Sequence, residues 1–183
     1  MNWVNTFLIL ATAFLAVFWE AAFPGLSRVF GAQVDLLPPL MVYAALSTNL
    51  TTVCLLAFWG GLWFDSLSAT PLGISILPLF GIGLAIHLCR DLVLRDRTFA
   101  QVVIGLGASA AAPLLTLLLL LTAGHTPIVG WGTIWQLIVM SASGALVTPL
   151  YFLLFDWLQR TFLHSPLPET SFRSDREIRR GRV

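Results

Sequence analysis

The chain has 183 residues, of which 57% are hydrophobic and 10% are charged, and its mean hydropathy is +0.86. Soluble domains carry roughly 25% charged residues, so this composition excludes an ordinary water-soluble domain and predicts a protein that spans a lipid bilayer. The net charge is +1, but all ten basic residues are arginines, and half of them lie in the last twelve positions.

Apolar runs, separated by short stretches of glycine, proline and polar residues, predict six helices. The run 36–67 would form one helix about 48 Å long, which exceeds a hydrocarbon core of about 30 Å, so we divide it at Ser47-Thr48-Asn49. Thr70 is a suitable cap for the next helix, and Pro71 a suitable first residue. The predicted helices cover residues 4–23, 37–46, 50–67, 71–89, 99–121 and 133–158.

The arginines predict the orientation of these helices, because cytoplasmic loops collect positive charge. Arg90, Arg95 and Arg97 mark one cytoplasmic loop, and the basic tail marks another, so we expect the C-terminus to be cytoplasmic. Six crossings place the N-terminus in the cytoplasm and five place it outside. The arginines do not separate these alternatives, whereas the helix lengths favour six.

The predicted fold is therefore an all-α, polytopic integral membrane helix bundle with six transmembrane helices, five being the alternative. The transmembrane domain covers residues 1–160. Residues 161–183 form a basic tail that we expect to be poorly ordered and cytoplasmic. Its arginines fit either anionic lipid headgroups, which we favour, or a cytosolic partner. They are Arg173, Arg176, Arg179, Arg180 and Arg182.

The sequence has no recognisable catalytic motif. It contains no H-E-x-x-H, no C-x-x-C and no glycine-rich phosphate loop, and its three histidines, His87, His125 and His164, lie in different segments. We therefore expect no enzyme activity, no cofactor, no metal and no nucleic-acid partner.

Three acidic residues lie within the predicted helices, where ionisable side chains are costly and often functional. Asp65 follows a long apolar run, and two interpretations of it remain open. It either caps the following turn by accepting backbone N–H groups from 66–70, or it takes part in binding. Glu20 lies near the end of the first helix, and Asp156 near the end of the last, four residues before Arg160.

Small residues recur at helical spacing in the last two predicted helices. Such residues let membrane helices approach closely, and we favour packing within the bundle over contact with a partner. They are Gly105, Ala108, Ser109 and Ala112 in one helix and Ser141, Gly144, Ala145 and Thr148 in the other.

The stretch FWGGLWFDSLSATPLG, residues 58–73, contains Gly61-Leu62, then Asp65, then Pro71-Leu72-Gly73. It resembles the G-L-x-x-D-x-x-x-x-x-P-L-G signature of the rod-shape-determining protein MreD family. The early segment DLLPPLMVYAAL and the closing PLYFLLFDWLQR are also similar to that family, so the resemblance covers roughly residues 4–160.

This resemblance implies a non-catalytic subunit of the bacterial cell-wall elongation complex in the inner membrane. Its expected partners are MreC, the elongation transpeptidase with RodA, MreB filaments and membrane lipid. The alternative is a small-molecule-binding membrane subunit of a vitamin-type transporter, in which Glu20 and Asp65 line a pocket. An intramembrane enzyme acting on lipid-linked precursors ranks last, because the sequence offers no paired acid and base.

Overall fold

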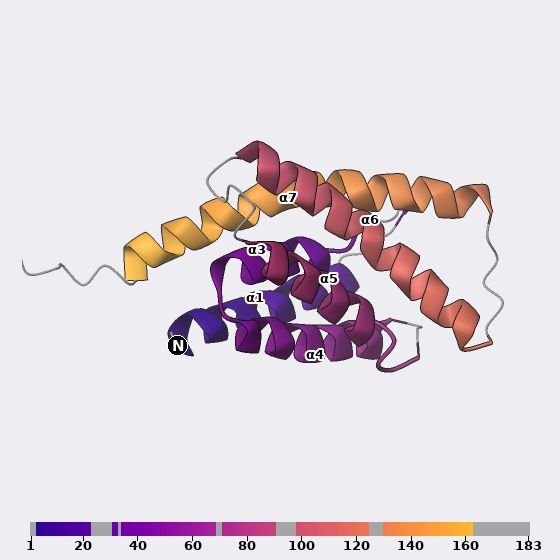
Figure 1. The fold of residues 1–183 in the computed structure, drawn as a ribbon, viewed down its shortest axis with the longest axis horizontal. Helices are drawn as coiled ribbons and strands as arrows, with labels where there is room; N and C mark the ends of the chain where they lie inside the picture. Colours follow the sequence, from indigo (N-terminus) through magenta and orange to yellow (C-terminus); the bar gives the residue numbers. More distant parts are fainter. Residues whose placement is uncertain are drawn as a thin grey trace, which may run out of the picture.

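In a computed structural model, the chain forms a bundle of α-helices (Figure 1). The structure describes residues 3–22, 31–32, 34–68, 71–90, 98–124 and 130–162, except for the side chains of residues 160 and 162. Within these ranges there are six helices and no strand. They are α1 (Trp3–Ala22), α3 (Leu37–Ser47), α4 (Leu50–Leu67), α5 (Ile76–Cys89), α6 (Thr98–Thr122) and α7 (Trp131–Phe162).

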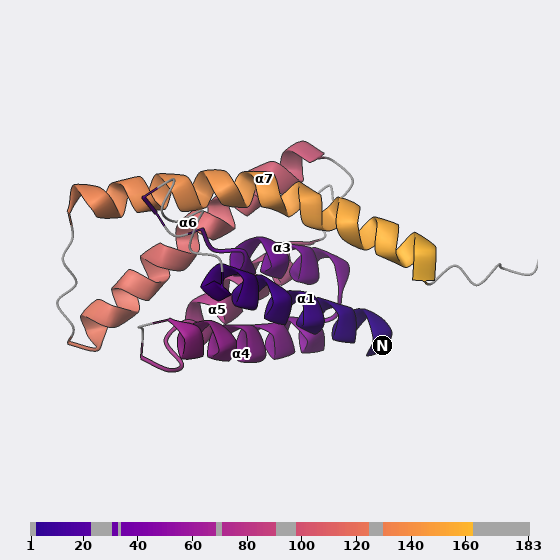
Figure 2. The same ribbon diagram turned by 180° about the vertical axis from the view of Figure 1, so that it is seen from behind.

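Successive helices run in opposite directions along the long axis of the molecule (Figures 1 and 2). One end of the bundle contains the last turns of α1, α4 and α6 and the first turns of α3, α5 and α7. Glu20, Asp35 and Asp65 belong to this end, which we call the acidic end. The start of α1 and the last turn of α7 lie at the opposite end.

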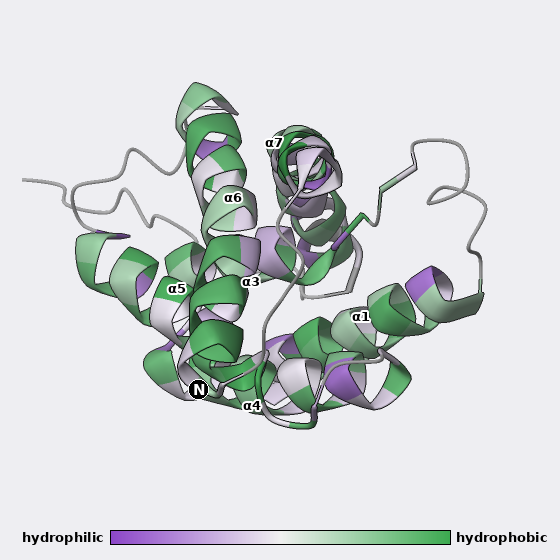
Figure 3. Cartoon of the chain, turned by 90° about the vertical axis from the view of Figure 1, so that its right-hand side faces the viewer, coloured by the Kyte–Doolittle hydropathy of each residue, from purple (hydrophilic) through white to green (hydrophobic). Residues whose placement is uncertain are grey.

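Four of the described helices, α1, α4, α6 and most of α7, are long and apolar enough to cross a membrane, while α3 and α5 are shorter apolar helices. Figure 3 shows apolar residues on many outward-facing positions of the bundle. Large apolar side chains that face outward include Phe7, Leu146 and Leu153. This pattern is that of a helical membrane protein, whose surrounding solvent is lipid.

The predicted division of 36–67 into two helices is confirmed, because α3 ends at Ser47 and α4 begins at Leu50. The predicted start of the next helix is wrong. Residues 72–75 form turns, so α5 begins at Ile76 and not at Pro71. Thr70 lies outside the described residues. At the other end of the chain, α7 continues to Phe162, two residues beyond the predicted domain boundary.

The short helix α3 is the centre of the core. Every residue from Leu37 to Leu46 is buried, and α3 packs against every other described helix. A helix that is hydrophobic on all sides is stable only when it is surrounded in this way. The ring of Tyr43 stacks on that of Phe155, with 4.3 Å between centroids, and meets Phe152 edge to face at 5.1 Å.

The small residues of α6 and α7 pack within the bundle, as predicted. A Cβ added to Gly105 would lie 2.7 Å from the Thr148 Cβ and 2.8 Å from the Gly144 carbonyl oxygen, and one added to Gly144 would overlap the Ser109 side chain. The two helices therefore touch at backbone distance here. Figure 1 shows that they cross and then diverge toward the acidic end.

Candidate functional site

Asp65 joins the end of α4 to the start of α5. Its carboxylate is 2% exposed, and its Oδ2 accepts the backbone N–H groups of Gly73 at 2.7 Å and Ser75 at 3.2 Å. The first N–H groups of a helix lack partners within that helix, so this carboxylate stabilises the start of α5. Asp65 thus makes a capping contact, but its two observed donors are Gly73 and Ser75 and not the expected residues 66–70, of which 69 and 70 lie outside the described residues.

Two glycines of the sequence motif make this turn possible. A Cβ on Gly61 would lie 2.9 Å from the Ile76 Cα, so α4 and α5 approach here as only glycine allows. Gly73 has a φ of +94°, a conformation that other residues rarely adopt. The structure thus brings Gly61 and Asp65 of α4 close to the start of α5, which Gly73 precedes.

The other three motif residues contribute less to the interior of this turn. Leu62 is half-buried, whereas Pro71 and Leu72 are exposed. Leu72 is 69% exposed and presents an apolar surface at the acidic end. The motif therefore combines residues that fix the turn with residues that lie on its surface.

Glu20 and Asp35 form a second, similar arrangement at the start of α3. Glu20 Oε1 accepts the N–H of Leu36 at 2.5 Å, and Asp35 Oδ1 accepts the N–H of Leu37 at 2.9 Å. The next two residues are prolines, which have no N–H. The donors at this buried helix start are thus either bonded or absent, which allows the helix to begin inside the bundle.

The two arrangements share a plan. A carboxylate at the end of one helix accepts backbone N–H groups at the start of the next, antiparallel helix, whose first turn contains proline. The sequence carries a weak sign of this plan, because VFWE at 17–20 is similar to LWFD at 62–65. Glu20 was predicted as a polar residue of the membrane region, but Asp35 was not predicted as a site residue. Its position before Leu-Leu-Pro-Pro is the signal that was overlooked.

Burial controls the electrostatics of Asp35, which is 9% exposed. Removal from water disfavours the charged form and raises the pKa of Asp35 from its ordinary 3.8 to about 6, although the hydrogen bond from Leu37 acts in the opposite direction. Asp35 thus changes protonation state closer to neutral pH than an exposed aspartate does.

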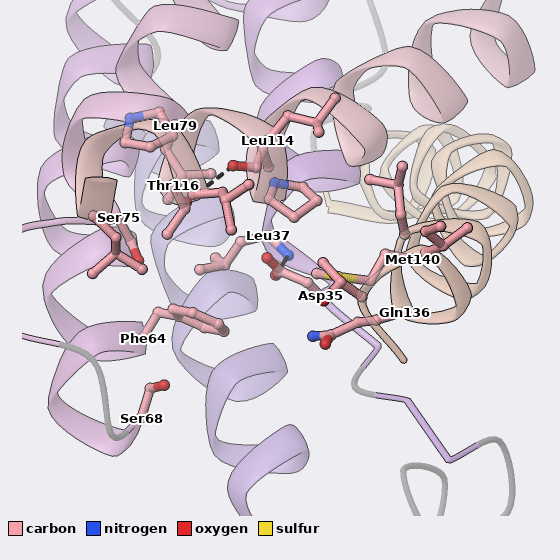
Figure 4. Close-up of a pocket in the computed structure, with 18 residues that line it drawn as sticks. Asp35, Leu37, Phe64, Ser68, Ser75, Leu79, Leu114, Thr116, Gln136 and Met140 are labelled. Carbon is pink, nitrogen blue, oxygen red and sulfur yellow. Dashed lines mark hydrogen bonds between the residues drawn. The ribbon is translucent and has the colours of Figure 1, made fainter. Parts of the chain in front are cut away.

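A cavity of about 490 Å³ opens between the diverging parts of α6 and α7 and the starts of α3 and α5. In the view of Figure 4, Asp35, Gln136 and Met140 lie toward the same side of this cavity. Asp35 is the single ionisable residue among the described residues that line it. The lining residues are Asp35, Leu37, Phe64, Ser68, Ser75, Pro78, Leu79, Ala112, Pro113, Leu114, Thr116, Leu117, Leu120, Thr133, Ile134, Gln136, Leu137 and Met140.

The remaining predicted site residues lie elsewhere. Asp156 is exposed near the end of α7, far along the bundle from the acidic end. The side chain of its expected partner Arg160 lies outside the described part of the structure. The same is true of all five tail arginines, Arg173, Arg176, Arg179, Arg180 and Arg182.

Histidines and potential metal ligands do not gather in the described ranges. His87 Nδ1 lies 3.0 Å from the Ala45 carbonyl oxygen, where it joins the ends of α5 and α3. Within the described ranges there is no group of three or more His, Cys, Asp or Glu side chains that could hold a metal ion. His125 and His164 lie outside those ranges.

Fold and site together define a helical membrane-protein bundle with two carboxylate-capped helix starts and a cavity at its acidic end. No family model matches the chain, and no curated protein and no solved structure matches it either.

Proposed function

We propose that this protein is a non-catalytic membrane subunit of the bacterial cell-wall elongation complex, of the MreD type. It would bind MreC and help to position peptidoglycan synthesis by the elongation transpeptidase and RodA, in proximity to MreB filaments. The protein would thereby help to maintain cell shape. The starting point is the resemblance of residues 58–73 to the MreD signature.

One structural observation supports this proposal. The signature residues Gly61, Asp65 and Gly73 each have a demanding steric or hydrogen-bonding role in the α4–α5 turn. Asp65 thus holds the backbone of Gly73 and Ser75 against α4, and the neighbouring side chain of Leu72 is exposed. An exposed apolar residue beside backbone that is held in place suits binding to a partner, because little conformational entropy is lost on association.

We further propose six membrane crossings in the bacterial inner membrane, with both termini in the cytoplasm. The alternating directions of the six helices favour six crossings over five. The segment with Arg90, Arg95 and Arg97 and the arginine-rich tail both follow helices that end away from the acidic end. By the positive-inside tendency, the acidic end then faces the periplasm.

The short helices α3 and α5 are compatible with this topology. An 11-residue helix is about 16 Å long and cannot cross a core of about 30 Å alone. However, α3 is enclosed by the other helices, and its starting N–H groups are bonded to Glu20 and Asp35. Its ends can therefore lie below the membrane surface without exposing unpaired backbone groups to lipid.

The first test is to deplete the protein in its own host and to image the cells. Loss of rod shape with misplaced wall synthesis is the expected result, and unchanged shape would contradict the proposal.

Rescue with Leu72→Glu then tests the turn. We expect this variant to be produced normally but to restore shape poorly and to lose co-purification with MreC. Leu88→Glu is the matched control. Leu88 is 73% exposed, but it lies in the last turn of α5, away from the acidic end.

A second candidate function is a ligand-binding subunit of a vitamin-type transporter. The cavity beside Asp35 favours it, since its volume falls in the ~300–1,000 Å³ range of small-molecule sites. Depletion would then leave cell shape unchanged and create a nutrient requirement. Native mass spectrometry of the purified protein would show a bound metabolite.

A further inference from the structure

We propose that the cavity at the acidic end is a lipid site, which holds the ammonium headgroup of an aminophospholipid against Asp35 and part of one acyl chain between α6 and α7. This inference goes beyond the scaffold function and does not depend on which protein partner the chain binds. It rests on the shape of the cavity, its lining and the hydrogen bonding of Asp35.

The polar part of the site is built around one carboxylate. Asp35 Oδ1 is engaged with the Leu37 N–H, whereas Oδ2 accepts no hydrogen bond from any described residue. Oδ2 is also absent from the fully buried atoms without partners, so it keeps some accessible surface, and Asp35 is one of the residues that line the cavity. A side chain that is nine-tenths buried thus directs a free acceptor into an otherwise mostly apolar space.

The lining selects the charge of the headgroup. No arginine, lysine or histidine is among the described lining residues, and the other polar side chains are those of Ser68, Ser75, Thr116, Thr133 and Gln136. A phosphate or carboxylate group beside Asp35 would meet a like charge without compensation. An ammonium group instead forms a charge-assisted hydrogen bond with Oδ2.

The apolar part of the cavity suits the acyl chain of a lipid. Leu114, Leu117 and Leu120 line one wall from α6, and Ile134 and Leu137 line the other from α7. Leu114 and Ile134 are also about half exposed. The walls are thus continuous with the lipid-facing surface, so that a bilayer lipid can enter between the two diverging helices.

The volume favours a lipid over a partner helix as the occupant. One helical turn, about 10 Å across and about 5.4 Å long, already fills ~420 Å³. A cavity of about 490 Å³ would therefore hold little more than a single turn. A headgroup with part of one acyl chain is smaller than a helix and suits a space of this size.

The test uses the full chain, purified in mild detergent and titrated with phosphatidylethanolamine or phosphatidylglycerol during native mass spectrometry. We expect preferential retention of phosphatidylethanolamine. Asp35→Asn should weaken that retention about tenfold or more, because a hydrogen bond between charged groups is lost. The variant keeps a side-chain oxygen for the Leu37 N–H. Asp156→Asn is the matched control, because it removes the same charge from an exposed position outside the cavity.

A second variant keeps the proposal testable if Asp35→Asn does not fold. Leu117→Trp narrows the apolar part of the cavity without changing Asp35. It should therefore reduce retention of the whole lipid. Equal retention of the two lipids by the wild type, or unchanged retention in a folded Asp35→Asn variant, would overturn the proposal. A water-soluble amine that co-purifies in place of lipid would also overturn it and would favour the metabolite-binding alternative.

Discussion

Replacement of Asp65 by alanine tests whether this carboxylate holds the α4–α5 turn. The substitution leaves the N–H groups of Gly73 and Ser75 without the acceptor that the structure shows. A buried donor without a partner costs about 1–3 kcal/mol, so two donors predict a loss of about 2–6 kcal/mol. Because folded proteins are stable by only about 5–15 kcal/mol, this loss should be plain in unfolding by denaturant, followed by far-ultraviolet circular dichroism.

Two further variants separate this mechanism from a general effect of removing charge. Asp65→Asn retains an oxygen acceptor and should lose about 1–2 kcal/mol, because the bonds are no longer assisted by charge. Asp156→Ala removes an exposed carboxylate and should change stability by less than about 0.5 kcal/mol. Hydrogen exchange should show faster exchange at Gly73 and Ser75 in the alanine variant. Equal stability of Asp65→Ala and Asp156→Ala would refute the capping role.

The α6–α7 contact and the buried Asp35 give two more predictions. Gly105→Ala should destabilise the bundle by about 1–3 kcal/mol, because its Cβ would meet Thr148. Gly107 has open space around it, so Gly107→Ala should stabilise α6 by up to about 1 kcal/mol. The denaturant concentration at the midpoint of unfolding measures both effects. Because burial raises the pKa of Asp35 from 3.8 to about 6, the folded state binds more protons than the unfolded state in this window. Stability should therefore fall by up to about 3 kcal/mol as pH rises from about 4 to about 6. Asp35→Asn should flatten that part of the profile, and an unchanged slope in the variant would contradict the assignment to Asp35.

The helices could be predicted closely from the sequence, because the pattern of apolar runs and helix-breaking residues is strong. The division at Ser47-Thr48-Asn49 illustrates this, since a physical length limit forces a break and the polar residues mark its place. The start of α5 was harder to predict. Pro71 has the local chemistry of a first helical residue, but Asp65 holds Gly73 and Ser75 in a turn that delays the helix to Ile76. This constraint comes from a side chain six or more residues away, which local propensity does not include.

The candidate site was predicted only in part for the same kind of reason. Asp65 and Glu20 stand out because each interrupts an apolar run. Asp35 lies at the end of a connecting segment, and only the Leu-Leu-Pro-Pro that follows it indicates that a buried helix starts there. Its burial arises from the position of α3 at the centre of the bundle. The cavity depends on the divergence of α6 and α7, which no local pattern specifies.

The two capped helix starts and the cavity are connected physically. Carboxylates from the protein itself, in place of water, satisfy the starts of α3 and α5, so both helices can begin inside the bundle. The α6–α7 pair is held differently, by backbone contact at Gly105 and Gly144, and this contact leaves the two helices free to diverge at the acidic end. The space between them adjoins the start of α3, where Asp35 lies. One residue thereby bonds a helix start through Oδ1 and presents Oδ2 to the cavity. Asp35→Asn therefore separates the two roles, because it retains the first and removes the charge that the second requires.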